Sequence, residues 1–198
     1  MLETTPGRTR VAVLISGAGS NMAALVDAGR GPEAAFEVAL VLSNKSSASG
    51  LVVAATKGLP VETIEHVAFG NDREAHEQAI DAALRLHGVS VVALAGYMRV
   101  LTPWMVGRWL GRMINIHPSL LPLYPGLDTH ARALADGRTD AGCSVHLVSD
   151  GVDEGRILAQ SRVPVVEGDT PESLAQRVRA AEHLLYHQAL SDFCRTLD

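Results

Sequence analysis

Two kinds of hydrophobic pattern take turns along the first part of the chain. Short, almost wholly apolar runs bounded by turn residues are typical of buried strands, and they predict strands at 10–17, 36–44, 60–65, 89–97 and 112–118. Segments with periodically spaced apolar residues are typical of helices, and they predict helices at 20–29, 48–59, 71–88 and from Pro103. Strands that alternate with helices indicate right-handed βαβ units and a parallel sheet.

The pattern changes after Pro118. A loop, a short helix, two strands and a long final helix are predicted at 119–130, 129–137, 142–149, 156–165 and 170–197. The two strands are joined by the acidic turn 150–155, and so short a joint makes an antiparallel pair. Thr170 is the predicted N-cap of the final helix. We therefore predict an α/β fold: a three-layer, Rossmann-like open sheet, mostly parallel, with an antiparallel C-terminal strand pair and a long closing helix.

No repeat, linker or low-complexity stretch divides the chain, so we expect a single domain over 10–198. The first nine residues, "MLETTPGRT", are polar and lack the apolar core of a signal peptide. We expect residues 1–9 to form a flexible leader.

Composition narrows the class of protein. The 198 residues are 47% hydrophobic but 4% aromatic, so we expect an aliphatic core. The formal charge of −5 and the absence of any Lys/Arg block give no support for nucleic-acid binding. No apolar run reaches about 18 residues, so we expect no membrane span. Cys143 and Cys194 form no CxxC pair, which argues against a disulfide scaffold and a structural metal site. The default expectation is a cytoplasmic protein.

A glycine-rich turn, "SGAGSN" at 16–21, joins the first predicted strand to the first helix. Gly17 and Gly19 let the backbone approach a ligand, and the free N–H groups of a helix start favour an anion. The turn is not a dinucleotide fingerprint, because Met22 stands where that pattern has its third glycine, and no Walker lysine follows. It therefore suits a single phosphate. The alternative is an ordinary turn capped by Ser20.

The stretch "NIHPS" ends the fifth predicted strand and places Asn115 and His117 two positions apart, on the same strand face. An amide N–H and a protonated imidazole are two donors that can converge on one oxygen. Such donors stabilise the oxyanion of a tetrahedral intermediate, and an imidazolium can also protonate a leaving nitrogen. A purely structural histidine is the alternative.

A carboxylate beside this histidine would help to keep it protonated, because a nearby negative charge raises a histidine pKa. Three acids, Asp150, Asp153 and Glu154, stand on the turn after the sixth predicted strand. We expect that turn at the same sheet end as "SGAGSN" and "NIHPS", because ligands of open α/β sheets bind outside the carboxyl ends of strands. A solvated hairpin is the alternative for these acids.

Other catalytic constellations are missing from the sequence. No serine or cysteine stands in a GxSxG-like setting, which argues against an acyl-enzyme. His183 and His187 are four positions apart, but a bare pair with this spacing usually arises by chance. The chemistry that remains is direct acyl transfer between two bound substrates.

Seven motifs, in order from about residue 10 to residue 190, resemble those of the folate-dependent formyltransferases. They are "LISGAGSN", "VVALAGYMRVL", "INIHPSLLPLYPG", "THARAL", "GCSVHLV", "DEGRILAQ" and "RVRAAEHLLY". "NIHPSLLP" with a later D-x-G is shared across that family, whereas "SGxGSN" and the "EH" of the last helix are typical of its glycinamide ribonucleotide branch. The chain departs from the pattern at Leu123, Cys143 and Arg156, and none of these removes a catalytic group.

The resemblance implies a one-carbon group transferase of purine biosynthesis. Such an enzyme moves the formyl group of its co-substrate, 10-formyltetrahydrofolate, to the amine of 5'-phosphoribosylglycinamide. It does so by direct attack through a tetrahedral intermediate. From the residues themselves we expect no metal, nucleic-acid or membrane partner, and a homodimer is left open.

The resemblance also implies roles for particular residues. His117 would be the general acid, Asn115 its oxyanion partner, and Asp153 the carboxylate that raises the histidine pKa. The substrate would be bound by Gly19, Ser20, Asn21, Arg179 and Glu182. The folate would meet the main chain of Met98, Arg99, Val100, Leu101, Ser149, Asp150, Gly151, Val152 and Asp153, and its acidic end would meet Arg73.

Other functions within and beyond this family stay open. A formyltetrahydrofolate hydrolase would carry an additional N-terminal regulatory domain, and we expect none because the first strand starts at residue 10. A methionyl-tRNA formyltransferase would carry a C-terminal domain and a basic surface, whereas this chain is acidic and ends with its closing helix. A non-catalytic mononucleotide-binding module would have no need for Asn115, His117 and Asp153 at one sheet end.

Overall fold

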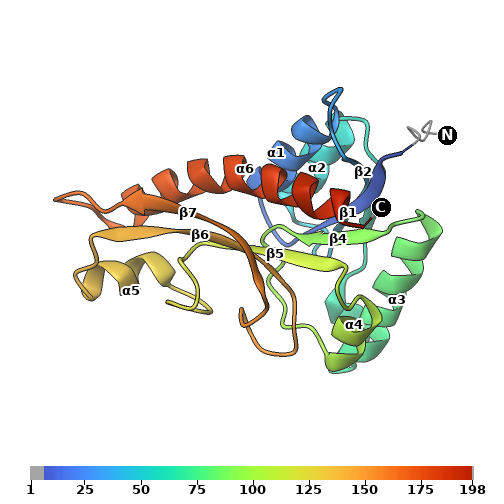
Figure 1. Cartoon of the computed structure of the whole chain (residues 1–198). Helices are drawn as coiled ribbons and strands as arrows, with labels where there is room; N and C mark the ends of the chain where they lie inside the picture. Colours follow the sequence, from blue (N-terminus) through green and yellow to red (C-terminus); the bar gives the residue numbers. More distant parts are fainter. Residues whose placement is uncertain (1–6, 198) are drawn as a thin grey trace.

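In the computed structural model, which describes residues 7–197, one seven-stranded sheet runs through the molecule in the order β3-β2-β1-β4-β5-β6-β7 (Figure 1). The first five strands are parallel, β6 is antiparallel to β5, and β7 is antiparallel to β6. This confirms the predicted fold class. The strands are β1 (Thr9–Ile15), β2 (Phe36–Ser43), β3 (Val61–Thr63), β4 (Val91–Leu94), β5 (Met113–His117), β6 (Asp140–Leu147) and β7 (Ile157–Pro164).

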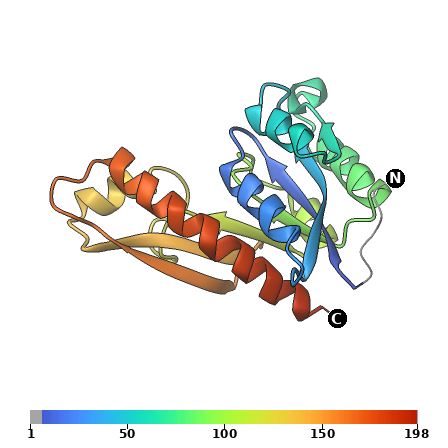
Figure 2. The ribbon, with the colours of Figure 1, turned by 90° about the horizontal axis from the view of Figure 1, so that it is seen from above.

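Helices cover both faces of this sheet. Buried side chains of α1, α2 and α6 pack on one face, and those of α3 and α4 pack on the other. Figure 2 shows α6 lying across its face beside α1. The helices are α1 (Ser20–Gly29), α2 (Ser49–Thr56), α3 (Arg73–Leu86), α4 (Pro103–Arg108), α5 (Thr129–Ala135) and α6 (Pro171–Arg195), with a 3₁₀ turn, η1 (His66–Phe69), before α3.

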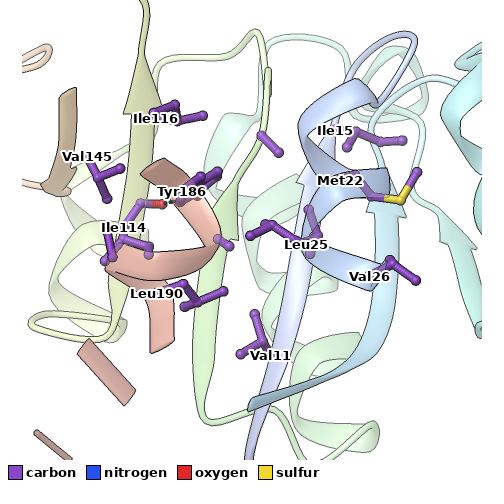
Figure 3. Close-up of a cluster of buried hydrophobic side chains, with 14 of the residues drawn as sticks. Val11, Ile15, Met22, Leu25, Val26, Ile114, Ile116, Val145, Tyr186 and Leu190 are labelled. Atoms are coloured by element: carbon purple, nitrogen blue, oxygen red, sulfur yellow. Dashed lines mark hydrogen bonds between the residues drawn. The ribbon is translucent and has the colours of Figure 1, made fainter. Parts of the chain in front are cut away.

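The core on the α6 face is aliphatic, as the composition predicts. Ile15 of β1 packs with Met22 and Leu25 of α1, and all three are fully buried (Figure 3). Tyr186 brings a rare aromatic ring into this cluster, and its hydroxyl donates to the carbonyl of Leu94 at 2.9 Å. Because a buried hydroxyl needs a partner, this bond ties the middle of α6 to the end of β4.

The observed elements are mostly shorter than the sequence pattern predicts. The strand predicted at 89–97 is only β4, and the chain leaves the sheet as a loop after Leu94. The long final helix ends at Arg195, and Thr170 is its N-cap, as predicted. The apolar residues after β4 therefore belong to a loop. Periodicity alone does not distinguish such a loop from a strand.

The first strand begins earlier in the sequence than predicted, and the residue before it is anchored to the body of the protein. Thr9 already belongs to β1, and the Arg8 guanidinium donates to the carbonyls of Gly29 at 3.0 Å and Gly31 at 2.7 Å. Of the leader predicted at 1–9, residues 1–6 lie outside the described part of the chain.

The acidic turn after β6 reaches the expected sheet end by a different route from the one predicted. Because β6 runs antiparallel, its last residue, Leu147, pairs with Ile114 near the start of β5. The loop 148–156 then folds back, which brings Asp153 to within 3.2 Å of the His117 side chain. The loop, rather than the strand end, places the acid.

The two outer strands of the sheet differ from the inner ones. β3 has only three residues, whereas β7 has eight and pairs with β6 alone among the described strands. β7 carries the 75% exposed side chain of Arg162 and ends at the exposed Pro164.

Candidate active site

A cleft with a volume of about 840 Å³ opens beside the carboxyl ends of β4 and β5. The strand order reverses between β1 and β4, and ligands of open α/β sheets bind at such a switch point. The walls come from segments far apart in the sequence. They include Asn21, 96–101, Asn115, His117, 126–131, His146, 148–153 and Glu182.

Asn115, His117 and Asp153 meet in this cleft. His117 Nδ1 lies 3.2 Å from one carboxylate oxygen of Asp153, and the Asn115 amide donates to the other at 3.4 Å. His117 Nε2 lies 2.9 Å from the carbonyl oxygen of Tyr124. Both imidazole nitrogens therefore face acceptors, so only the doubly protonated ring can donate to both.

Burial nevertheless lowers the pKa of His117 below its usual value. The Tyr124 carbonyl and the Asp153 charge both push that pKa upward, as the sequence reasoning expects of Asp153, but they only partly offset the burial. The expectation of a histidine with a raised pKa is therefore wrong for the ligand-free cleft. The physical reason is that His117 is 5% exposed, and a charged ring loses most of its hydration there.

His146 completes this group and was missed by the sequence reasoning. It stands opposite Asn115 on β6, with its Nε2 atom 3.1 Å from the Asn115 amide and 3.5 Å from Asp153. Its Nδ1 atom lies 2.8 Å from the carbonyl of Leu147. The register of β6 against β7 shifts between Val145 and His146, and such irregularities re-aim side chains. A bulge of this kind leaves no signal in the hydrophobic pattern.

The backbone around the cleft is strained at three residues. Tyr124, Asp128 and Asp153 have φ values of 54°, 57° and 57°, and they are the only described residues other than glycine with positive φ. Left-handed conformations of such residues are uncommon and cluster at functional sites. Gly155 adds a further constraint, because a Cβ atom there would lie 1.7 Å from the Leu147 carbonyl oxygen. The D-x-G sequence thus holds Asp153 in a conformation that few residues adopt.

The turn at 16–21 presents an open helix start. Gly19 is the N-cap of α1, with φ of 72°, and no side chain caps this helix. The alternative of a turn capped by Ser20 is therefore wrong, because Ser20 is the first helical residue. Gly17, Ala18 and Ser20 are exposed, so this helix start is accessible from solvent. Gly50 of α2 packs behind the turn and donates its N–H to the Gly17 carbonyl at 3.0 Å.

Asn21 links this turn to α6. Its amide donates to Glu182 at 2.9 Å, while its side-chain oxygen is buried without a hydrogen-bond partner. Burial raises the pKa of Glu182, and the Asn21 bond and the Arg179 charge oppose that shift. Arg179 is exposed one turn before Glu182, and its charge also helps to lower the pKa of His130 at the cleft wall, although burial contributes more.

The segments expected to hold the folate, 98–101 and 149–153, both line the cleft. The guanidinium of Arg73 donates to the carbonyl of Val100 and so braces the loop 96–101. Its expected contact with the acidic end of the folate stays a prediction. Met98 and Val100 are exposed by 66% and 59%, which gives this wall an apolar surface.

The three departures from the family pattern leave the cleft intact. The Arg156 carbonyl accepts a hydrogen bond from Leu147 at 2.9 Å and so closes the loop that carries Asp153. Leu123 is 38% exposed at the surface. Burial raises the pKa of the Cys143 thiol to about 12, so this cysteine is a packing residue rather than a nucleophile.

Within residues 7–197, no three or more His, Cys, Asp or Glu side chains are grouped so as to hold a metal ion. In the same range, no helix is both long and apolar enough to cross a membrane.

Comparison with known proteins supplies a family and close relatives. The model of the formyl transferase family matches residues 9–190. The phosphoribosylglycinamide formyltransferase of Escherichia coli K12 is 42% identical over 183 residues, 92% of this chain and 86% of that protein. The human trifunctional purine biosynthetic protein adenosine-3 is 45% identical over 183 residues, but this chain spans only 18% of its length.

Two solved structures also resemble this chain in sequence and fold. The phosphoribosylglycinamide formyltransferase of Brucella melitensis is 50% identical, with a TM-score of 0.91 over 94% of this chain and 96% of that one. The glycinamide ribonucleotide transformylase 1 of Symbiobacterium toebii is 41% identical, with a TM-score of 0.93 over 99% of this chain and 92% of that one.

Proposed function

The chain belongs to the formyl transferase family, and on that premise we propose that it transfers the formyl group of 10-formyltetrahydrofolate to the amine of 5'-phosphoribosylglycinamide. The observation that carries the proposal is the meeting of Asn115, His117 and Asp153 in a cleft that also contains Asn21, at the open start of α1. Donors for an oxyanion and a site for a phosphate are what this reaction needs together.

The reaction requires one bond to form and one to break. The substrate amine attacks the formyl carbon, the carbonyl oxygen becomes an oxyanion, and the bond from that carbon to N10 of the folate then breaks. One proton leaves the amine and one arrives at N10, so the overall charge is conserved. Asn115 and His117 supply two donors to the oxyanion, and His117 supplies the proton to N10.

The contacts of His117 support Nε2 as the nitrogen that would donate to the oxyanion and to N10. The Nδ1 contact is with a carboxylate, and charge-assisted bonds are stronger than bonds to a neutral carbonyl. The Nε2 contact with the Tyr124 carbonyl is therefore the one given up when substrate enters. Burial favours the neutral ring in the free enzyme, but a developing oxyanion beside it favours the imidazolium. The cleft would therefore bind the transition state more strongly than the ground state.

Four segments would bind the two substrates. The N–H groups of Gly19, Ser20 and Asn21 would bind the phosphate, and Arg179 and Glu182 of α6 would lie along the ribonucleotide. The loops 98–101 and 149–153 would enclose the pterin, since such a ring needs an apolar slot with a few polar partners. The location in the cytoplasm and the oligomeric state stay predictions.

One assay separates this function from its alternatives. Protein, formyl donor and glycinamide ribonucleotide are mixed, and folate absorbance is followed with and without the ribonucleotide. Donor loss that requires the ribonucleotide supports the transferase. Donor loss without it would indicate a formyltetrahydrofolate hydrolase, and tight ribonucleotide binding with no donor loss would indicate a binding module.

A further inference from the structure

Ser16, directly after β1, connects the turn 16–21 to the loop 96–101. Its backbone N–H donates to the carbonyl of Gly96 at 3.0 Å, and its hydroxyl oxygen accepts from the N–H of Met98 at 2.8 Å. One residue therefore holds two points of the loop 96–101 next to the turn 16–21. Gly96 has φ of 76°, which a residue with a side chain rarely adopts.

Asn44 fixes the direction of the Ser16 hydroxyl. The hydroxyl hydrogen donates to the Asn44 side-chain oxygen at 2.6 Å, and that oxygen can only accept. Because the single hydrogen points at Asn44, a lone pair is left for the Met98 N–H. Asn44 is itself 1% exposed, and its amide group lies 3.3 Å from the His66 ring.

The same loop is held at its far end by a second buried group. Glu77 is 3% exposed and accepts hydrogen bonds from the backbone N–H of Thr102, at 2.9 Å, and from its hydroxyl. The residues between these two anchors, 99–101, line the cleft. The N–H of Met98 is turned into the protein and is not available to a ligand.

We propose that Ser16 and Asn44 are positioning residues for the folate. They hold the loop 96–101 in the position in which its free main-chain groups contact the pterin. This inference rests on the proposed function, since it assigns that loop to the formyl donor. Neither side chain touches the donor. Their effect passes through the Met98 N–H, so it should fall on donor binding and spare the ribonucleotide.

The test compares Ser16→Ala with the unaltered protein. We expect the dissociation constant of a tetrahydrofolate analogue with carbon in place of N10 to rise about 10-fold, because a buried N–H loses its acceptor. The donor KM should rise by a similar factor, with kcat and ribonucleotide affinity within about 3-fold. Amide hydrogen exchange at Met98 should become faster in the ligand-free variant.

Two further variants separate positioning from general destabilisation. Ser43→Ala removes another buried serine hydroxyl at a strand end. Within residues 7–197 the hydrogen bonds of that hydroxyl go to Lys45 in its own turn, so donor KM should not change. Asn44→Asp keeps an acceptor for the Ser16 hydroxyl and should retain most of the donor affinity, whereas Asn44→Leu should behave like Ser16→Ala.

An unchanged donor KM and analogue affinity in Ser16→Ala would overturn the inference and leave the proposed function standing. Equal losses of donor and ribonucleotide affinity would also overturn it, since they would indicate a purely structural role. If the unaltered protein fails to bind the analogue, the proposed function itself is wrong and the inference falls with it.

Discussion

At the scale of single residues, the cleft pairs side chains whose burial would be unfavourable without a partner. His117 and Asp153 are nearly buried, and each offsets part of the other's lost hydration. Burial alone would raise the pKa of Asp153, but hydrogen bonds from His146 and the Gly126 N–H, together with the His117 charge, lower it below its usual value. The carboxylate therefore stays charged at neutral pH and can act on the histidine.

The two proposed oxyanion donors should act as a unit. Removing one such donor typically lowers turnover about 100- to 1000-fold. We expect Asn115→Ala and His117→Ala each to lose at least that much in kcat, with ribonucleotide affinity nearly unchanged. The kcat of the double variant should be only slightly below that of the less active single variant, because both donors serve the same oxygen. Near-normal turnover by His117→Ala would rule out the mechanism.

The Asp153 charge should govern the pH dependence of the reaction. Asp153→Asn removes a charge that raises the pKa of His117, so that pKa should fall further below its usual value of about 6.5. The rate requires the protonated ring, so the basic limb of the kcat profile should move to lower pH. Glu154→Gln is the matched control, since Glu154 is the next residue and is exposed. A shift of equal size in both variants would count against the role of Asp153.

At the scale of elements, the conformation of the turn 16–21 depends on how closely α2 approaches it. A Cβ atom on Gly50 would lie 2.6 Å from Ile15 Cδ1, 3.0 Å from the Gly17 oxygen and 3.1 Å from the Gly19 Cα atom. The backbone of the turn thus rests directly on the start of α2, and only glycine permits that contact.

Gly50→Ala should therefore displace the turn 16–21. Overpacking at such a contact typically costs about 1–3 kcal/mol in the free energy of unfolding. We expect that loss, together with a decrease of about 10-fold or more in ribonucleotide affinity measured by calorimetry. Gly107→Ala in α4 is the control, because a Cβ atom there meets nothing within 4 Å. Unchanged ribonucleotide affinity in Gly50→Ala would show that the turn does not hold the phosphate.

The sequence predicts these elements well where periodicity decides them, and poorly where packing does. Thr170 and Asn115 could be placed from capping chemistry and strand alternation alone. His146, Ser16 and the fold-back of the loop 148–156 could not. They depend on a register shift, on a contact between residues 82 positions apart, and on the antiparallel turn of β6, none of which has a local signal.

At the scale of the whole molecule, buried and half-buried histidines link stability to pH. Burial lowers the pKa of four described histidines, namely His76, His117, His130 and His183. The unfolded chain therefore binds more protons than the folded one just below a pH of about 6.5. Stability from these groups is present above that pH and is lost as the pH falls toward the lowered pKa values. Glu182, whose pKa is raised, acts in the opposite direction.

We therefore expect the free energy of unfolding, measured in urea, to be lower at a pH of about 5.5 than at about 7.5. His76 is 1% exposed and lies away from the cleft walls, so His76→Gln should reduce this difference without affecting activity. A larger or equal difference in that variant would contradict the assignment.

The outer strand β7 has a consequence for behaviour in crowded solution. An edge strand of eight residues offers unpaired backbone groups that can template the addition of another chain, which is a common route to aggregation. Arg162 and Pro164 stand on that edge, and a charge and a residue without an N–H are the features that discourage such pairing. We therefore expect this outer strand to resist the addition of another chain along its open edge.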